Sequence, residues 1–167
     1  MPSSWSYPSS VTQYAEVPNH IAWREVGNEF TQLNFVTTIT DLKHISNTAV
    51  NDIKMKTYYL VLTGFQWLDL PASIVGIQVQ VNVKRLGRIT DDTVSLYLNQ
   101  GIGENRANAD LANDKIYGSE TDVWGLETIT SAMMNDSNFG LILRYQSHPS
   151  WPHSAAPIMQ HVQIRAW

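Results

Sequence analysis

The feature that most constrains the fold is a strict alternation of apolar and polar residues over positions 77–84. The apolar members are β-branched and the intervening ones are polar: Ile77, Val79, Val81 and Val83 against Gln78, Gln80, Asn82 and Lys84. A period of two is typical of a β-strand that has one face in a core and the other in water or against a polar partner. We therefore expect a β-sheet with one buried face.

Other segments have the composition of strands and are separated by turn signals. The strongest are residues 57–63, 94–99, 139–145 and 162–166, and the weaker ones are 22–26, 35–40 and 115–117. Residues 128–136 are the best helix candidate, and 41–56 has the composition of a long loop or a ragged edge. Many short strands without alternating helices predict an all-β fold, an antiparallel β-sandwich of jelly-roll type with at most one short helix.

The N-terminal segment differs from the rest of the chain. Residues 1–19 contain three prolines, five serines and one charged residue, Glu16. Proline restricts its own φ and the conformation of the preceding residue, so we expect an extended arm over 1–19 and a single β-sandwich domain over 20–167. The alternative is a loose terminus. If the arm is held, we expect it to dock on a neighbouring subunit through aromatic residues and proline: Trp5, Tyr7, Pro8 and Tyr14.

Composition excludes several classes of function. A chain of 167 residues is the size of one domain, and a net charge of −4 with a pI near 5.6 argues against nucleic-acid binding. The absence of cysteine excludes disulfides, thiol nucleophiles and Cys-ligated zinc. No apolar run approaches the length of a membrane span, and no signal peptide precedes the arm, so we expect neither a membrane nor a nucleic-acid partner.

No constellation for catalysis can be assembled from the sequence. His148 and His153 do not have a zinc-site spacing, and the prolines between them prevent a helix that would pair them. Acidic pairs that might suggest calcium, Asp91 with Asp92 and Asp110 with Asp114, lie outside any regular twelve-residue loop of oxygen ligands. Asp91 and Asp92 are expected instead to fix a turn at a strand start. We predict a non-enzyme with no catalytic residues, no metal and no cofactor.

A set of motifs between residue 57 and the C-terminus carries a resemblance to a known module. They are YLVLTGF (59–65), LPASIVGI (70–77), ITDDTVSL (89–96), YG (117–118), DVWGL (122–126), SNFGL (137–141) and HVQIR (161–165). In this order and spacing they resemble a β-sandwich module, similar to jelly rolls and carbohydrate-binding modules, of virion structural proteins in tailed bacteriophages. The resemblance covers about two-thirds of the chain and leaves out the arm.

The resemblance implies a structural protein on the outer surface of a phage particle. Because a short chain without a coiled coil leaves no room for a fibre shaft, we favour a head decoration or cement protein. Its partners would be the major capsid protein and further copies of itself, for example in a trimer. The alternatives are a host-glycan-binding module of a tail fibre or baseplate, and a small tail or neck adaptor. The residues predicted for glycan or subunit contact are Tyr145, His148, Trp151 and His153, where Trp151 would either stack on a sugar or plug a loop.

Overall fold

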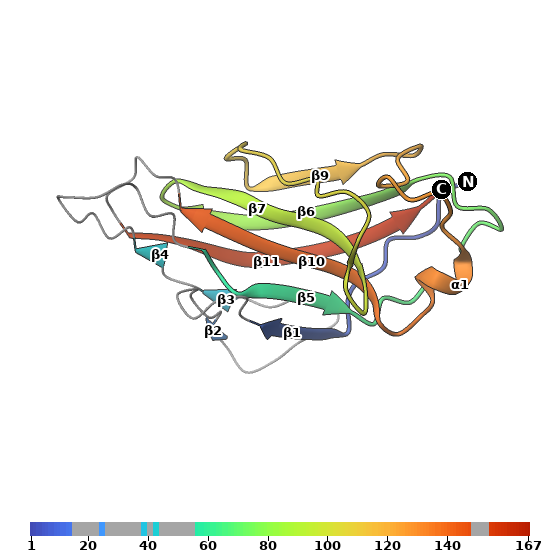
Figure 1. The fold of residues 1–167 in the computed structure, drawn as a ribbon, viewed down its shortest axis with the longest axis horizontal. Helices are drawn as coiled ribbons and strands as arrows, with labels where there is room; N and C mark the ends of the chain where they lie inside the picture. Colours follow the sequence, from blue (N-terminus) through green and yellow to red (C-terminus); the bar gives the residue numbers. More distant parts are fainter. Residues whose placement is uncertain (15–23, 26–37, 40–41, 44–55, 148–153) are drawn as a thin grey trace.

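The fold is an antiparallel β-sandwich, as the alternating strands predict. The computed structural model describes residues 1–14, 24–25, 38–39, 42–43, 56–147 and 154–167. These residues form two sheets that pack face to face (Figure 1). The prediction of an antiparallel all-β sandwich with at most one short helix is therefore confirmed. The jelly-roll connection pattern stays a prediction.

Each sheet mixes strands from distant parts of the chain. The first sheet has the order β1 (Ser10–Tyr14), β5 (Tyr59–Thr63), β10 (Phe139–Ser147), β7 (Ile89–Leu98) and β8 (Gly101–Ile102). The second has the order β2 (Arg24–Glu25), β3 (Thr38–Ile39), β11 (Ser154–Ala166), β6 (Ile77–Leu86) and β9 (Asp114–Gly118), and β4 (Leu42–Lys43) also pairs with β11. The weak strand candidates at 22–26, 35–40 and 115–117 thus each contain part of a strand. Most of the predicted loop at 41–56 lies outside the described residues.

Strand β6 shows how the alternation produces a core. Its four apolar residues, Ile77, Val79, Val81 and Val83, are at most 1% exposed. Its polar residues lie on the other face, where Gln78, Gln80 and Asn82 are half-buried and Lys84 is exposed. The apolar faces of both sheets meet around large side chains such as Phe65, Trp124 and Phe139.

A bulge in β7 decides which polar residue enters the core. Arg144 of β10 lies opposite Thr93, whereas the next residue, Tyr145, lies opposite Asp91, so Asp92 is the extra residue. The Asp91 carboxylate is consequently buried between the sheets, and Asp92 lies on the outer face with Arg144.

A second bulge changes which side chains of the C-terminal strand face the core. The pairing of β11 with β6 shifts register between Met159 and His161. Because of the inserted residue, Met159 and Val162 both reach the core, although three positions separate them.

The short helix has the place predicted for it and is shorter than the candidate stretch. Helix α1 spans Ser131–Met134, and the Thr130 hydroxyl caps it by accepting from the Met133 amide at 3.1 Å. Ile129 and Met134 anchor it in the core, and Ala132 is exposed. Within the described residues, no helix is long and apolar enough to cross a membrane.

The N-terminal arm, described over 1–14, packs on its own chain and contacts both sheets. Ser3 and Ser6 form backbone hydrogen bonds with Ala166 and Ile164 of β11, and β1 then pairs with β5 (Figure 1, dark blue). The described part of the arm thus contacts its own chain, and its docking on a neighbouring subunit stays a prediction. Within the described residues, β3 pairs with β11 only at Ile158 and Met159, so the C-terminal part of that edge is open to the arm.

Candidate functional site

The arm and the loop after β5 line an open pocket of about 480 Å³, which we call the arm pocket. Its lining consists of aromatic, hydroxyl, amide and small side chains: Trp5, Ser6, Tyr7, Pro8, Ser9, Gly64 and Gln66. None of these side chains carries a charge at neutral pH. Three of the four residues predicted as arm anchors therefore come together around one hollow.

The Trp5 ring is held from the C-terminal strand. The Arg165 guanidinium lies 4.4 Å from the centroid of the Trp5 ring and 4.3 Å from that of Trp167, so it stands between two indoles. Its Nε and Nη2 donate to Gln78 Oε1 at 3.1 and 2.8 Å. These contacts combine cation–π attraction with hydrogen bonds, and they fix the orientation of Trp5.

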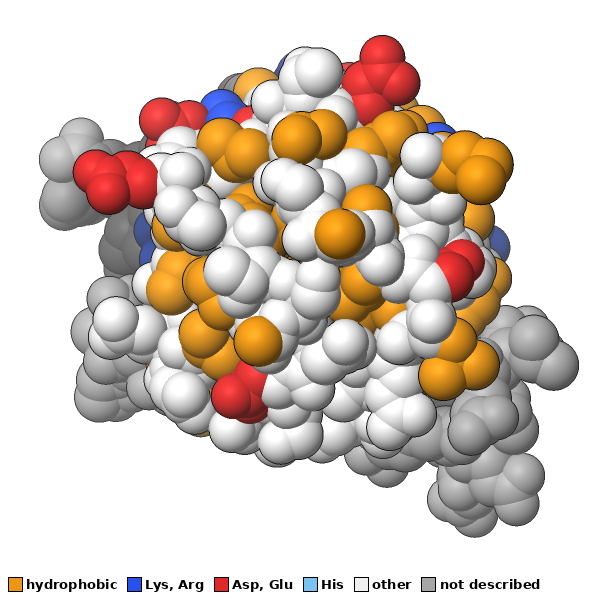
Figure 2. All heavy atoms as spheres, turned by 90° about the vertical axis from the view of Figure 1, so that its right-hand side faces the viewer, with side chains coloured by type: hydrophobic (Ala, Val, Ile, Leu, Met, Phe, Trp, Pro, Cys, Tyr) orange, Lys and Arg blue, Asp and Glu red, His pale blue; other side chains and the backbone are white. Residues whose placement is uncertain are grey.

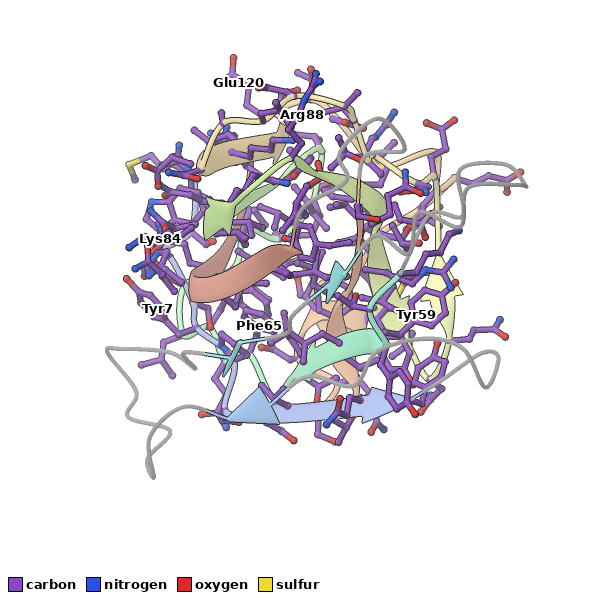
Figure 3. All side chains as sticks on the ribbon, turned by 90° about the vertical axis from the view of Figure 1, so that its left-hand side faces the viewer. Tyr7, Tyr59, Phe65, Lys84, Arg88 and Glu120 are labelled. Atoms are coloured by element: carbon purple, nitrogen blue, oxygen red, sulfur yellow. The ribbon has the colours of Figure 1, made fainter. Side chains whose placement is uncertain are left out.

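The Tyr7 ring is also held by a side chain of β11. Its ring packs edge-on against His161 of β11, with the centroids 5.4 Å apart and the planes at 74°. Its hydroxyl makes no hydrogen bond within the described part of the chain. Figure 3 shows Tyr7 at the outer side of the second sheet, on the same side as Lys84.

The backbone on the far side of the pocket is fixed by two serine hydroxyls. The Ser6 hydroxyl donates to the Gln66 carbonyl at 2.7 Å and accepts from the Gln66 amide N–H at 2.8 Å. The Ser9 hydroxyl donates to the Gly64 carbonyl at 2.9 Å. The Gln66 side chain is exposed, and its amide has no hydrogen-bond partner among the described residues.

Tyr14, the fourth predicted anchor, does not belong to the arm pocket. Its ring lies 5.0 Å from the ring of Tyr59 in a tilted stack, and Figure 3 places Tyr59 on the opposite side of the molecule from Tyr7. Tyr14 remains 44% exposed. The arm thus carries two separate aromatic contacts, one for each sheet.

One residue predicted for glycan or subunit contact must be corrected. Tyr145 is completely buried, because the β7 bulge places it opposite Asp91 with its side chain between the sheets. Burial raises the pKa of its phenol, and the Arg85 guanidinium lies 5.3 Å from its ring centroid. Tyr145 therefore cannot contact a glycan or another subunit. The other three residues, His148, Trp151 and His153, lie outside the described residues.

An ionic cluster centred on Asp91 was not foreseen from the sequence. Its carboxylate binds Arg85 Nη2 at 2.8 Å, Lys115 Nζ at 2.8 Å and the Tyr117 hydroxyl at 2.7 Å. Both ion-pair partners are almost completely buried. Burial lowers the pKa of the Lys115 ammonium, and the Asp91 carboxylate opposes this shift. The predicted turn-fixing role of Asp91 is thus wrong: the residue connects three strands.

Asp92 has a different set of partners on the outer face of the first sheet. Lys56 Nζ lies 2.7 Å from its carboxylate, and Arg144 Nε donates to the same group. The Arg144 guanidinium also lies 4.0 Å from the centroid of the Tyr59 ring. Because Asp91 and Asp92 face opposite sides of the sheet, they do not form a common cation site.

The second acidic pair is also engaged separately. Asp110 accepts from the backbone N–H of Ala112 at 3.0 Å, and Asp114 accepts from the Asn82 side chain. Within the part of the chain that the structure describes, no group of three or more His, Cys, Asp or Glu side chains is arranged to hold a metal ion.

No protein-family model, no curated protein and no solved structure matches this chain.

Proposed function

We propose that this chain is a non-enzymatic structural protein of a tailed-bacteriophage particle. In this proposal it decorates the outside of the head and stabilises the capsid through contacts with the major capsid protein and with copies of itself. The assignment to a phage particle rests on the sequence resemblance. The role in binding, as opposed to catalysis, rests on the structure of the described surface.

The observation that carries the binding role is the aromatic surface beside the arm pocket. Trp5, Tyr7 and Trp167 are all half-buried and lie within one small region at the edge of the second sheet. Partly exposed aromatic residues that are held rigid are typical of the central contacts in protein interfaces. By contrast, the Asp91 carboxylate is buried and is engaged by Arg85, Lys115 and Tyr117 inside the fold.

A second apolar feature lies at the end of the sandwich where the two termini meet (Figure 1). The loop between β5 and β6 exposes Leu68 completely and Val75 to 53%. Figure 2 shows this end of the molecule, on which apolar side chains are spread among polar ones and acidic groups outnumber basic ones. Attachment to a particle surface would cover such side chains.

Copy number on the particle tests the proposed location. Quantitative mass spectrometry of purified particles should find on the order of hundreds of copies, since head lattices repeat their subunits by symmetry. About a dozen copies or fewer would contradict head decoration and favour the tail or neck adaptor, or the baseplate module.

Attachment itself can be tested with surface variants. Leu68→Asp combined with Val75→Asp should weaken binding of the purified protein to particles that lack it, with the melting temperature unchanged. Lys84→Ala, an exposed change on β6, is the matched control. Equal binding by the double variant would show that this end is not the contact.

The non-enzymatic role is tested by turnover. We expect no product from glycan, ester or peptide substrates incubated with the purified protein. A released product that disappears when a single Asp or Glu is replaced would contradict the proposal.

A further inference from the structure

We propose that the arm pocket binds a neutral saccharide. This goes beyond attachment to a particle, because it gives the protein a small-molecule ligand whatever its location. The site differs from the one expected from the sequence, since it is lined by the arm and the loop after β5 and does not include Tyr145.

The chemistry of the lining matches an uncharged sugar. A pyranose ring presents apolar C–H faces that pack on aromatic rings, and hydroxyls that need both donors and acceptors. In the arm pocket, the rings of Trp5 and Tyr7 can pack on the C–H faces, and the Gln66 amide can bind the hydroxyls. Because no lining side chain is charged, nothing in it favours a phosphate, a carboxylate or an ammonium. A volume of about 480 Å³ lies within the range of small-molecule sites.

The two aromatic side chains are positioned before any ligand arrives. Trp5 is held by Arg165, which Trp167 and Gln78 hold in turn, and Tyr7 is held by His161. A rigid ring loses little conformational entropy on binding, which favours a weakly interacting ligand such as a sugar.

Two polar groups of the lining without a partner in the described part of the chain are of the kind that a sugar needs. The serine hydroxyls of the lining are engaged with the backbone of Gln66 and Gly64. The Tyr7 hydroxyl and the Gln66 side-chain amide have no hydrogen-bond partner within the described residues. Together they provide both donors and acceptors at the pocket.

An extended peptide is the less suitable ligand for this place. Peptides that add to a sandwich do so as an extra strand on an open sheet edge. Here the edge of β5 is paired with β1, and the C-terminal part of β11 bonds to Ser3 and Ser6. The pocket thus offers side chains and not a free strand edge.

Titration of the full-length protein with simple glycosides tests the inference. We would record ¹⁵N–¹H spectra of the protein with the methyl glycosides of glucose, galactose, mannose and N-acetylglucosamine at millimolar concentrations. N-acetylneuraminic acid and glucuronic acid serve as charged comparisons. We expect at least one neutral glycoside to shift the indole N–H signal of Trp5, and neither acid to do so.

Variants show whether the arm pocket is responsible. Tyr7→Ala and Gln66→Ala should each raise Kd at least tenfold. Gln66→Ala removes only an exposed side chain, so loss of folding does not obscure its result. Tyr14→Ala, which removes an arm aromatic residue away from the pocket, should leave Kd unchanged.

Several results would overturn the inference: no binding of any neutral glycoside, binding of the acids alone, or equal affinity of the wild-type protein and both pocket variants. Each of these results is independent of copy number and particle attachment. Saccharide binding can therefore be contradicted while head decoration stands, and head decoration can be contradicted while saccharide binding stands.

Discussion

The ammonium group of Lys115 lies 2.8 Å from the carboxylate of Asp91, and neither side chain is more than 4% exposed. Lys115 belongs to β9 of the second sheet and Asp91 to β7 of the first. The pair therefore connects the two layers of the sandwich through the core, and the Tyr117 hydroxyl donates to the same carboxylate at 2.7 Å. Arg85 of β6 binds the other carboxylate oxygen from the second sheet.

Replacing Asp91 should strongly destabilise the fold. Asp91→Ala leaves Arg85 and Lys115 buried without their anion, and removing one partner of a buried ion pair costs about 3–5 kcal/mol. Urea unfolding would measure the loss. Glu120→Gln, at an exposed position (Figure 3), should change the free energy of unfolding by less than about 0.5 kcal/mol. If Asp91→Ala lowered the free energy of unfolding as little as Glu120→Gln does, the cluster would not connect the sheets.

Asp92 should make stability depend on acid pH. Burial works to raise its pKa, but hydrogen bonds and charges from Lys56 and Arg144 outweigh this, and the pKa is lowered from the ordinary value of 3.8. Its contribution is therefore present above pH 3.8 and is lost as pH falls through the lower folded-state pKa.

Asp92→Asn should accordingly be less stable than the wild type at pH 6, and the difference should shrink as the pH falls below 3.8. Melting temperatures recorded across this range would test the sign. A difference that stays constant with pH would exclude the ion pairs as its cause. NMR titration of Asp92 in Lys56→Gln should in addition show a pKa closer to 3.8.

The arm should contribute to the stability of its own domain. Ser6→Ala removes a hydroxyl that both donates to and accepts from the Gln66 backbone, and we expect a loss of about 1–3 kcal/mol. Deletion of residues 1–14 should lower the melting temperature further and promote aggregation, because it exposes the edges of β5 and β11. Light scattering and thermal melting would show both effects. An unchanged melting temperature after the deletion would favour an arm that docks on another subunit.

Two glycines should respond differently to the same substitution. Gly118 has a φ of +75°, and a Cβ there would lie 2.2 Å from the Ile77 carbonyl oxygen. Gly118→Ala should therefore destabilise the protein by about 2 kcal/mol or more, because it strains the backbone and displaces β6. At Gly101 the nearest atom would be 3.8 Å away, and Gly101→Ala should be nearly neutral. Chemical denaturation of the two variants side by side is the measurement. Equal losses would contradict the close approach at Gly118.

The alternating strand allows a sharp test of the core. Val81→Asp would place an unpaired charge at a position that is 1% exposed. We expect the protein to be largely unfolded, or less stable by about 4 kcal/mol or more, which is a large effect for a single substitution. Lys84→Asp, on the exposed face of the same strand, should leave the circular dichroism spectrum and the melting temperature nearly unchanged. A folded Val81→Asp protein would show that this face is not the core.

Period and composition are local properties, and they determined the local features of this protein. The alternation over 77–84 needs only neighbouring residues to predict which face of β6 is buried, and that face is buried. Scarcity of helix-forming sequence likewise predicted one short helix near residue 131. The prolines and serines of the first residues predicted extended backbone, and β1 lies there as an edge strand.

Tertiary structure alone decided the features that carry the functional proposals. The bulge in β7 shifts the register by one residue and places Asp91 and Tyr145 inside the core, where the alternation of the sequence does not predict an ionic group. The arm pocket depends on contacts between the two ends of the chain, such as Trp5 on Arg165, and on the loop after β5. No local pattern encodes which distant strand edge is left open, because that is settled only when all strands have paired. For this reason the sequence indicates contacts for the aromatic residues of the arm but does not predict Arg165 and His161 as their partners within the chain.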